Sequence, residues 1–75
     1  MNKTLVFSVI ALYKNINDGS LVIITNRKRF ENCRIDDLDL YVVYVRYKDN
    51  NLCRIEIDDI IGIQFQDKAT LVGMK

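Results

Sequence analysis

β-branched and aromatic residues crowd both sides of a short polar turn at residues 49–51. Valine and tyrosine crowd residues 40–48, and apolar residues alternate with charged ones over residues 52–57. β-branched and aromatic residues in this pattern favour strands that bury one face and expose the other. We therefore predict an antiparallel hairpin that continues into a further strand ending at Phe65. The side chains expected in the core are Val43, Val45, Ile55, Ile57, Ile61, Ile63 and Phe65.

A second hydrophobic run occupies residues 5–13, where almost every side chain is apolar. It is shorter than the ~20 residues that a membrane-spanning helix requires. Lys14 and Asn15 follow it, where a signal peptide would carry a small-residue cleavage site. Its β-branched and aromatic residues favour a strand, although Val6, Val9, Ile10 and Tyr13 are also spaced as in a helix. We predict a strand and keep a helix as the alternative.

A strand at residues 5–13 would be apolar on both faces, because alternate residues point to opposite sides. A sheet in so small a protein easily covers only one of these faces. The other is therefore expected to contact another protein or a second copy of the chain. The predicted contact residues are Leu5, Val6, Ile10 and Leu12. The alternative is a central strand in a tightly rolled barrel, which would bury both faces within one chain.

The remaining segments form short strands between polar turns. Asp18-Gly19 supplies the positive φ of a tight turn, and strands are predicted at residues 21–25 and 30–35. The basic residues 26–29 form a turn between these strands, and the acidic residues 36–39 end the second one. This order predicts an all-β or mainly β fold, a small antiparallel barrel of five to six strands with at most one short helical turn. We expect at least about 40% strand, above the usual share for a globular domain.

Composition indicates one folded domain that spans residues 1–75, with 49% hydrophobic and 28% charged residues. The net charge of +1 is far from the strongly basic surface that usually marks a nucleic-acid-binding domain. The chain has two cysteines and no histidine. If a strand lies between Cys33 and Cys53, their thiols are roughly 10 Å apart, too far for a disulfide.

We interpret both cysteines as small buried hydrophobic residues and expect a cytoplasmic protein. Two acidic pairs, Asp36-Asp37 and Asp58-Asp59, could suggest a hard metal ion. Neither pair has further oxygen ligands beside it, and aspartate commonly occupies turns and helix caps. We therefore predict turn or cap roles for both pairs, with no metal site and no cofactor.

Residues 21–30, Leu-Val-Ile-Ile-Thr-Asn-Arg-Lys-Arg-Phe, combine a strand with a polar turn, and residues 35–43, Ile-Asp-Asp-Leu-Asp-Leu-Tyr-Val-Val, combine an aspartate-bearing turn with another strand. Residues 57–61, Ile-Asp-Asp-Ile-Ile, fit a single helical turn before a last short strand. Over residues 20–66 this order resembles the small β-barrels of the Sm-like and SH3-like type. The resemblance implies a barrel fold and, as an alternative function, binding of single-stranded RNA or DNA.

Such binding would use a row of basic and aromatic side chains, because rings stack on bases and cations contact phosphates. The candidate residues are Arg27, Lys28, Arg29, Tyr44, Arg46 and Arg54. The chain departs from the Sm-like pattern where the family contacts RNA. Leu40 follows Asp39 in place of an asparagine, the later Arg-Gly element is missing, and no glycine marks the bend of the second strand.

No arrangement of residues indicates catalysis, because the chain lacks histidine and its two serines lie in neither a nucleophile elbow nor a phosphate loop. We predict a non-enzymatic protein-binding module that also forms a homo-oligomer and does not bind membranes. The abundance of isoleucine, asparagine, lysine and aspartate is typical of low-GC bacteria and their phages. A small regulator or inhibitor of a host protein would fit such a source.

Overall fold

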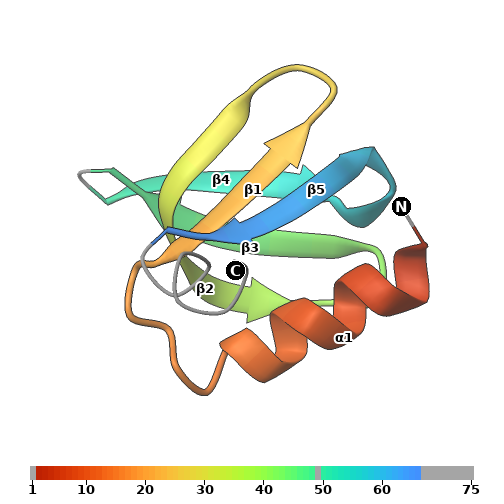
Figure 1. Ribbon diagram of the computed structural model, residues 1–75, viewed down its shortest axis with the longest axis horizontal. Coiled ribbons are helices and arrows are strands. Elements are labelled where there is room, and N and C mark those ends of the chain that lie inside the picture. The colour runs from red at the N-terminus through yellow and green to blue at the C-terminus, as the bar shows by residue number, and fades with distance from the viewer. Residues whose placement is uncertain (1, 49, 67–75) are drawn as a thin grey trace, which may run out of the picture.

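The computed structural model describes residues 2–48 and 50–66. Its elements in chain order are α1 (Lys3–Tyr13), β1 (Leu21–Thr25), β2 (Arg29–Leu38), β3 (Val42–Tyr47), β4 (Asn51–Glu56), the 3-10 turn η1 (Ile57–Asp59) and β5 (Ile60–Phe65) (Figure 1). Strands make up 52% of the described residues. The prediction of a mainly β fold is therefore confirmed.

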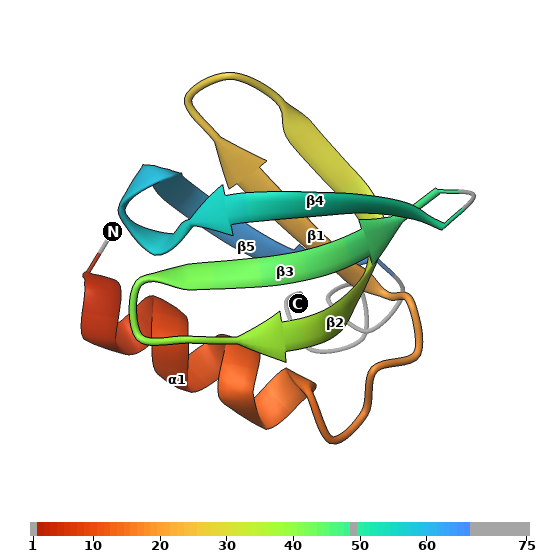
Figure 2. The ribbon, with the colours of Figure 1, turned by 180° about the vertical axis from the view of Figure 1, so that it is seen from behind.

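The five strands form one antiparallel sheet in the order β4-β3-β2-β1-β5. The long strand β2 joins its two parts, since its first half pairs with β1 and its second half with β3 (Figures 1 and 2). Asn32 in β2 has a φ of 57°, which breaks the regular ladder and lets the strand bend. Asn32 thus allows the strand to bend without the glycine that the Sm-like pattern has at its bend.

The sheet is not closed into a barrel, so this part of the fold prediction was wrong. Strands β4 and β5 follow each other along the chain, but η1 separates them and β5 pairs with β1 instead. They therefore lie at the two edges of the sheet. An open sheet leaves one row of backbone groups on each edge strand without a strand partner.

The first element is a helix and not the predicted strand. α1 begins after Asn2, whose side-chain oxygen accepts hydrogen bonds from the backbone N–H groups of Thr4 at 2.8 Å and Leu5 at 3.2 Å. An asparagine in this position satisfies donors that the first helical turn leaves unpaired. The buried residues of α1 are Val6, Ile10 and Tyr13. Their spacing places one apolar stripe against the sheet, which outweighs the strand propensity of the β-branched residues.

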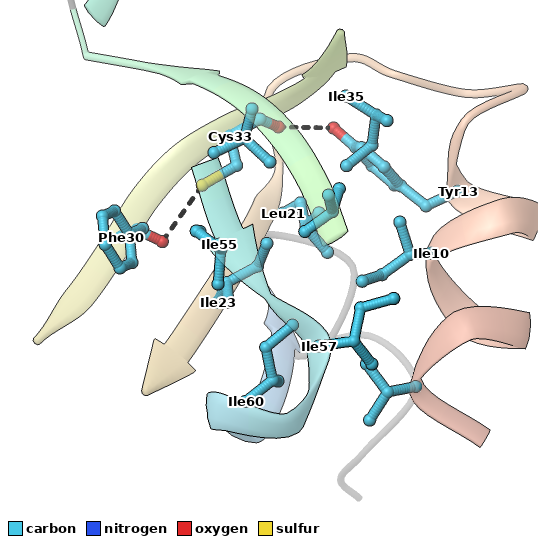
Figure 3. Packing of buried hydrophobic residues seen from close by; sticks show 13 residues of the cluster. Ile10, Tyr13, Leu21, Ile23, Phe30, Cys33, Ile35, Ile55, Ile57 and Ile60 are labelled. Atoms are coloured by element: carbon cyan, nitrogen blue, oxygen red, sulfur yellow. Dashed lines mark hydrogen bonds between the residues drawn. The ribbon is translucent and has the colours of Figure 1, made fainter. Parts of the chain in front are cut away.

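Side chains from α1, from every strand and from η1 form a single core (Figure 3). Four predicted core residues are buried, namely Val43, Val45, Ile55 and Ile57. Ile63 and Phe65 pack partly buried against them. Ile61 was predicted wrongly, because the three residues of η1 shift the alternation so that Ile60 points inward and Ile61 is 53% exposed.

The acidic residues do not end β2 where predicted. β2 continues to Leu38, and Asp36 lies within it and forms an ion pair with Arg46 of β3 at 3.2 Å. The turn begins at Asp39, whose side chain accepts a hydrogen bond from the Tyr41 N–H at 3.4 Å. Asp58 and Asp59 lie in η1, as expected for turn residues.

The two cysteines are free, as predicted, because Cys33 on β2 and Cys53 on β4 have β3 between them. Among the described residues no helix is long and apolar enough to cross a membrane.

Candidate functional site

The four predicted protein-contact residues lie on two different faces of α1. Val6 and Ile10 have no exposed surface and belong to the core. They cannot contact a partner in the folded protein, so the expectation that they lie on an exposed face was wrong. Leu5 and Leu12 are 53% and 71% exposed. In the helix the buried pair and the exposed pair lie on different faces. In a strand, Leu5 alone would lie opposite the other three residues.

The exposed face of α1 carries an apolar stripe. Its members are Leu5, Val9, Leu12 and Ile16. Ile16 extends the stripe beyond the last residue of α1, because backbone hydrogen bonds from Asn15 to Leu12 and from Ile16 to Tyr13 continue the helical turn. Spacings of four, three and four residues place side chains on one line along a helix, the geometry with which helices pack against each other. We call this line the α1 stripe.

A shallow cleft of about 340 Å³ lies on the other side of the exposed face. It is lined by Lys3, Thr4, Phe7, Leu40 and Tyr41. The Lys3 ammonium group lies 5.0 Å from the centre of the Tyr41 ring and 3.3 Å from a carboxylate oxygen of Asp58. Leu40 and Tyr41 are 62% and 65% exposed. Together with three residues of the α1 stripe, they make up five of the seven large hydrophobic side chains exposed in the described chain.

The Ser8 hydroxyl, between the stripe and this cleft, is satisfied within the helix. The Ser8 hydroxyl donates to the Thr4 carbonyl oxygen at 2.9 Å, inside the helix. Covering this face with a partner would therefore leave fewer polar groups without hydrogen bonds than an ordinary polar surface would.

The predicted basic and aromatic residues do not form one row. Arg27 and Lys28, from the β1–β2 turn, and Arg54 of β4 line an open cleft of about 300 Å³. The ammonium group of Lys28 lies 4.9 Å from the centre of the Phe30 ring and 5.2 Å from that of Tyr47. The two rings pack edge to face. The aromatic residues of this site are thus Phe30 and Tyr47, which were not among the predicted site residues.

The other three candidates lie outside this cleft. Arg29 forms an ion pair with Glu31 at 2.6 Å, and Arg46 forms one with Asp36. Tyr44 is half-buried and lies opposite Arg54 in the ladder of β3 and β4. Arg54 is itself 3.7 Å from Glu56, so the cleft has acidic as well as basic side chains.

A third cleft, of about 300 Å³, lies between the α1–β1 loop, β2 and the β3–β4 hairpin. Its described lining consists of Asp18, Gly19, Asn32, Arg34, Arg46, Lys48 and Asn50. Only Arg46 was a predicted site residue. The cluster depends on the register between β2 and β3, which the sequence pattern does not specify.

The Cys33 thiol is not available for chemistry at neutral pH. Burial is the main cause that raises its pKa to about 12, and the thiol lies 3.3 Å from the Phe30 carbonyl oxygen. The described residues contain no group of three or more cysteine, aspartate or glutamate side chains placed to hold a metal ion.

Comparison with known proteins finds no matching family model, no matching curated protein and no matching solved structure.

Proposed function

We propose that the protein is a non-enzymatic protein-binding module that binds a helix of its partner through the α1 stripe, and that it associates with itself through the same face. The observation that carries the proposal is the α1 stripe, in which Leu5, Leu12 and Ile16 are exposed and Val9 is half-buried, on a helix whose other face already fills the core. On a face that points to solvent, folding does not require apolar residues at the spacing of helix packing. It fits a helix that packs against a second helix.

Burial of the α1 stripe in a contact would favour association. Burying one leucine side chain contributes roughly 1.5–3 kcal/mol. In a symmetric dimer both copies bury their stripe residues, so each position contributes twice. Part of this gain offsets the loss of translational and rotational freedom on association.

The order of elements supports a distant relation to the Sm-like small β folds. A strand, a polar turn, a bent strand, an aspartate-bearing turn and a strand follow each other, with a 3-10 turn before the last strand. A small regulator or inhibitor of a host protein, in a bacterium or phage, is the role that we assign to such a module.

Sedimentation velocity tests the proposal. The wild type should associate at micromolar concentration, and Leu12→Glu should raise the dissociation constant at least about tenfold, because the charge would be desolvated in the contact. Leu52→Glu is the matched control, since Leu52 is 55% exposed on β4. A wild type that stays monomeric, or a control that weakens association as much as Leu12→Glu, would contradict self-association through α1.

Binding of single-stranded nucleic acid is the second candidate, and the cleft of Lys28, Phe30 and Tyr47 favours it, because rings and cations there come together. The acidic residues in the same cleft oppose it. We therefore expect dissociation constants weaker than about 10 µM at physiological salt, near the range of non-specific contact. Nanomolar, salt-sensitive binding that Lys28→Glu abolishes would favour the second candidate.

A further inference from the structure

The third cleft brings two arginines of neighbouring strands together. Arg34 of β2 and Arg46 of β3 are direct partners in the antiparallel ladder. Side chains in such a pair lie on the same face, with Cβ atoms about 4.5–5.5 Å apart, and two like charges in this position destabilise a sheet. The pair is therefore stabilised by anions that lie close to the guanidinium groups.

Acidic side chains also approach the cleft. Arg46 forms an ion pair with Asp36 at 3.2 Å. The described lining carries the positive charges of Arg34, Arg46 and Lys48 and the negative charge of Asp18. The described part of the cleft is therefore electropositive.

The Arg46 guanidinium is held by two contacts, since it donates from Nε to Asp36 and its Nη1 lies 3.5 Å from the Asn50 carbonyl oxygen. That of Arg34 lies beside Gly19, where an added Cβ atom would make an ordinary contact, 3.4 Å from the Arg34 Nε. Gly19 has a φ of 84°, a backbone conformation that glycine adopts easily.

We propose that this cleft binds a phosphate group, which would accept hydrogen bonds from Arg34 and Arg46 together while Lys48 approaches from the hairpin. Guanidinium groups present paired donors that match the oxygens of phosphate. The side-chain amides of Asn32 and Asn50 supply further polar groups in the lining. A volume of about 300 Å³ exceeds that of one phosphate group and leaves room for an ester substituent. This proposal is independent of the α1 stripe.

Titration of the ¹⁵N-labelled full chain tests it, with inorganic phosphate and uridine 5′-monophosphate as separate ligands and sodium chloride at equal ionic strength as the reference. We expect saturating shifts at the amides of Gly19, Asn32 and Asn50, with a dissociation constant for phosphate on the order of 1 mM. Tighter binding of the nucleotide than of phosphate would identify an ester as the ligand. Equal binding would indicate that the phosphate group alone is recognised.

Three variants separate a specific site from general attraction to a basic surface. Arg34→Gln should weaken phosphate binding about tenfold, the value of one lost charge-assisted contact. Arg34→Lys, which keeps the charge but loses the paired donors, should fall between Arg34→Gln and the wild type. Arg29→Gln removes the same charge outside the cleft and should bind phosphate like the wild type.

Amide spectra with unchanged dispersion would show that each variant is folded. The proposal is overturned if phosphate gives no saturation up to about 50 mM, far above the expected constant. It is equally overturned if Arg29→Gln weakens binding as much as Arg34→Gln does.

Discussion

At the residue scale, Tyr13 joins the end of α1 to the sheet through its hydroxyl group. The hydroxyl donates to the Cys33 carbonyl oxygen at 3.0 Å (Figure 3) and accepts a hydrogen bond from the Gly19 N–H at 2.8 Å. The ring packs against Phe65 with 5.7 Å between ring centres. Because Tyr13 is only 1% exposed, water cannot easily replace these hydrogen bonds.

Tyr13→Phe should keep the packing of the ring and leave a carbonyl group and an N–H group without their partner. We expect a loss of about 1–3 kcal/mol in the free energy of unfolding, equivalent to a melting temperature lower by at least about 4 °C for a domain of this size. Tyr41→Phe is the control, because Tyr41 is 65% exposed. Thermal unfolding followed by circular dichroism measures both. Equal melting temperatures for wild type and Tyr13→Phe would contradict this role.

Cys33 makes the stability of the protein decrease as the pH rises in the alkaline range. Burial raises the pKa of its thiol from 9.0 to about 12, against a smaller opposite effect of a backbone hydrogen bond from Ile23. Above pH 9.0 the unfolded chain loses this proton while the folded protein keeps it, so rising pH favours unfolding. Below pH 9.0 both states are protonated and the contribution is constant.

We therefore expect the free energy of unfolding to fall by up to about 1.4 kcal/mol per pH unit above that point. Cys33→Ala should be less stable than wild type at pH 8 but should lose less stability between pH 8 and pH 10. Urea unfolding at both pH values measures the difference. An equal loss in the two proteins would show that the Cys33 thiol does not cause it.

At the element scale, most strands could be predicted from alternation, because one face lies against the core and the other toward solvent. β1 is buried on both faces, and its signal was a continuous run of apolar residues. β1 has the predicted bounds, residues 21–25, and the helical turn expected within residues 57–61 is η1. The start of the chain could not be predicted in this way. Its apolar residues fit both a strand and a helix, and the cap formed by Asn2 was the signal that favoured the helix.

The choice between strand and helix at the start of the chain also explains why two of the predicted contact residues were wrong. Choosing a strand put Val6 and Ile10 on a contact face, whereas the helix buries them and exposes Leu5 and Leu12. The basic residues do not share one site, because bulges and ladder register decide which side chains meet. Neither is encoded in the hydrophobic pattern alone.

Ile10 and Leu12 provide a direct test of the orientation of α1. Ile10→Ala should cost about 2–5 kcal/mol of stability, since it leaves a cavity in the core. Leu12→Ala should change stability by no more than about 0.5 kcal/mol in the monomer, because its side chain is 71% exposed. Urea unfolding at low protein concentration compares the two variants. A larger loss for Leu12→Ala would mean that the other face of α1 points to the sheet.

At the scale of the whole molecule, the described residues form an open five-stranded sheet whose core is completed by α1. A chain of 75 residues buries only a modest core. Contact with a partner across the α1 stripe would add buried apolar surface to this core. We therefore propose that α1 uses one face for folding and the other for binding.

Intermolecular nuclear Overhauser effects test that claim most directly, in an equimolar mixture of ¹³C-labelled and unlabelled protein at a concentration where the chain associates. The account predicts contacts between copies at the methyl groups of Leu5, Leu12 and Ile16, and none at Ile10. Intermolecular contacts confined to Leu52 and Ile61, on the edge strands β4 and β5, would contradict it.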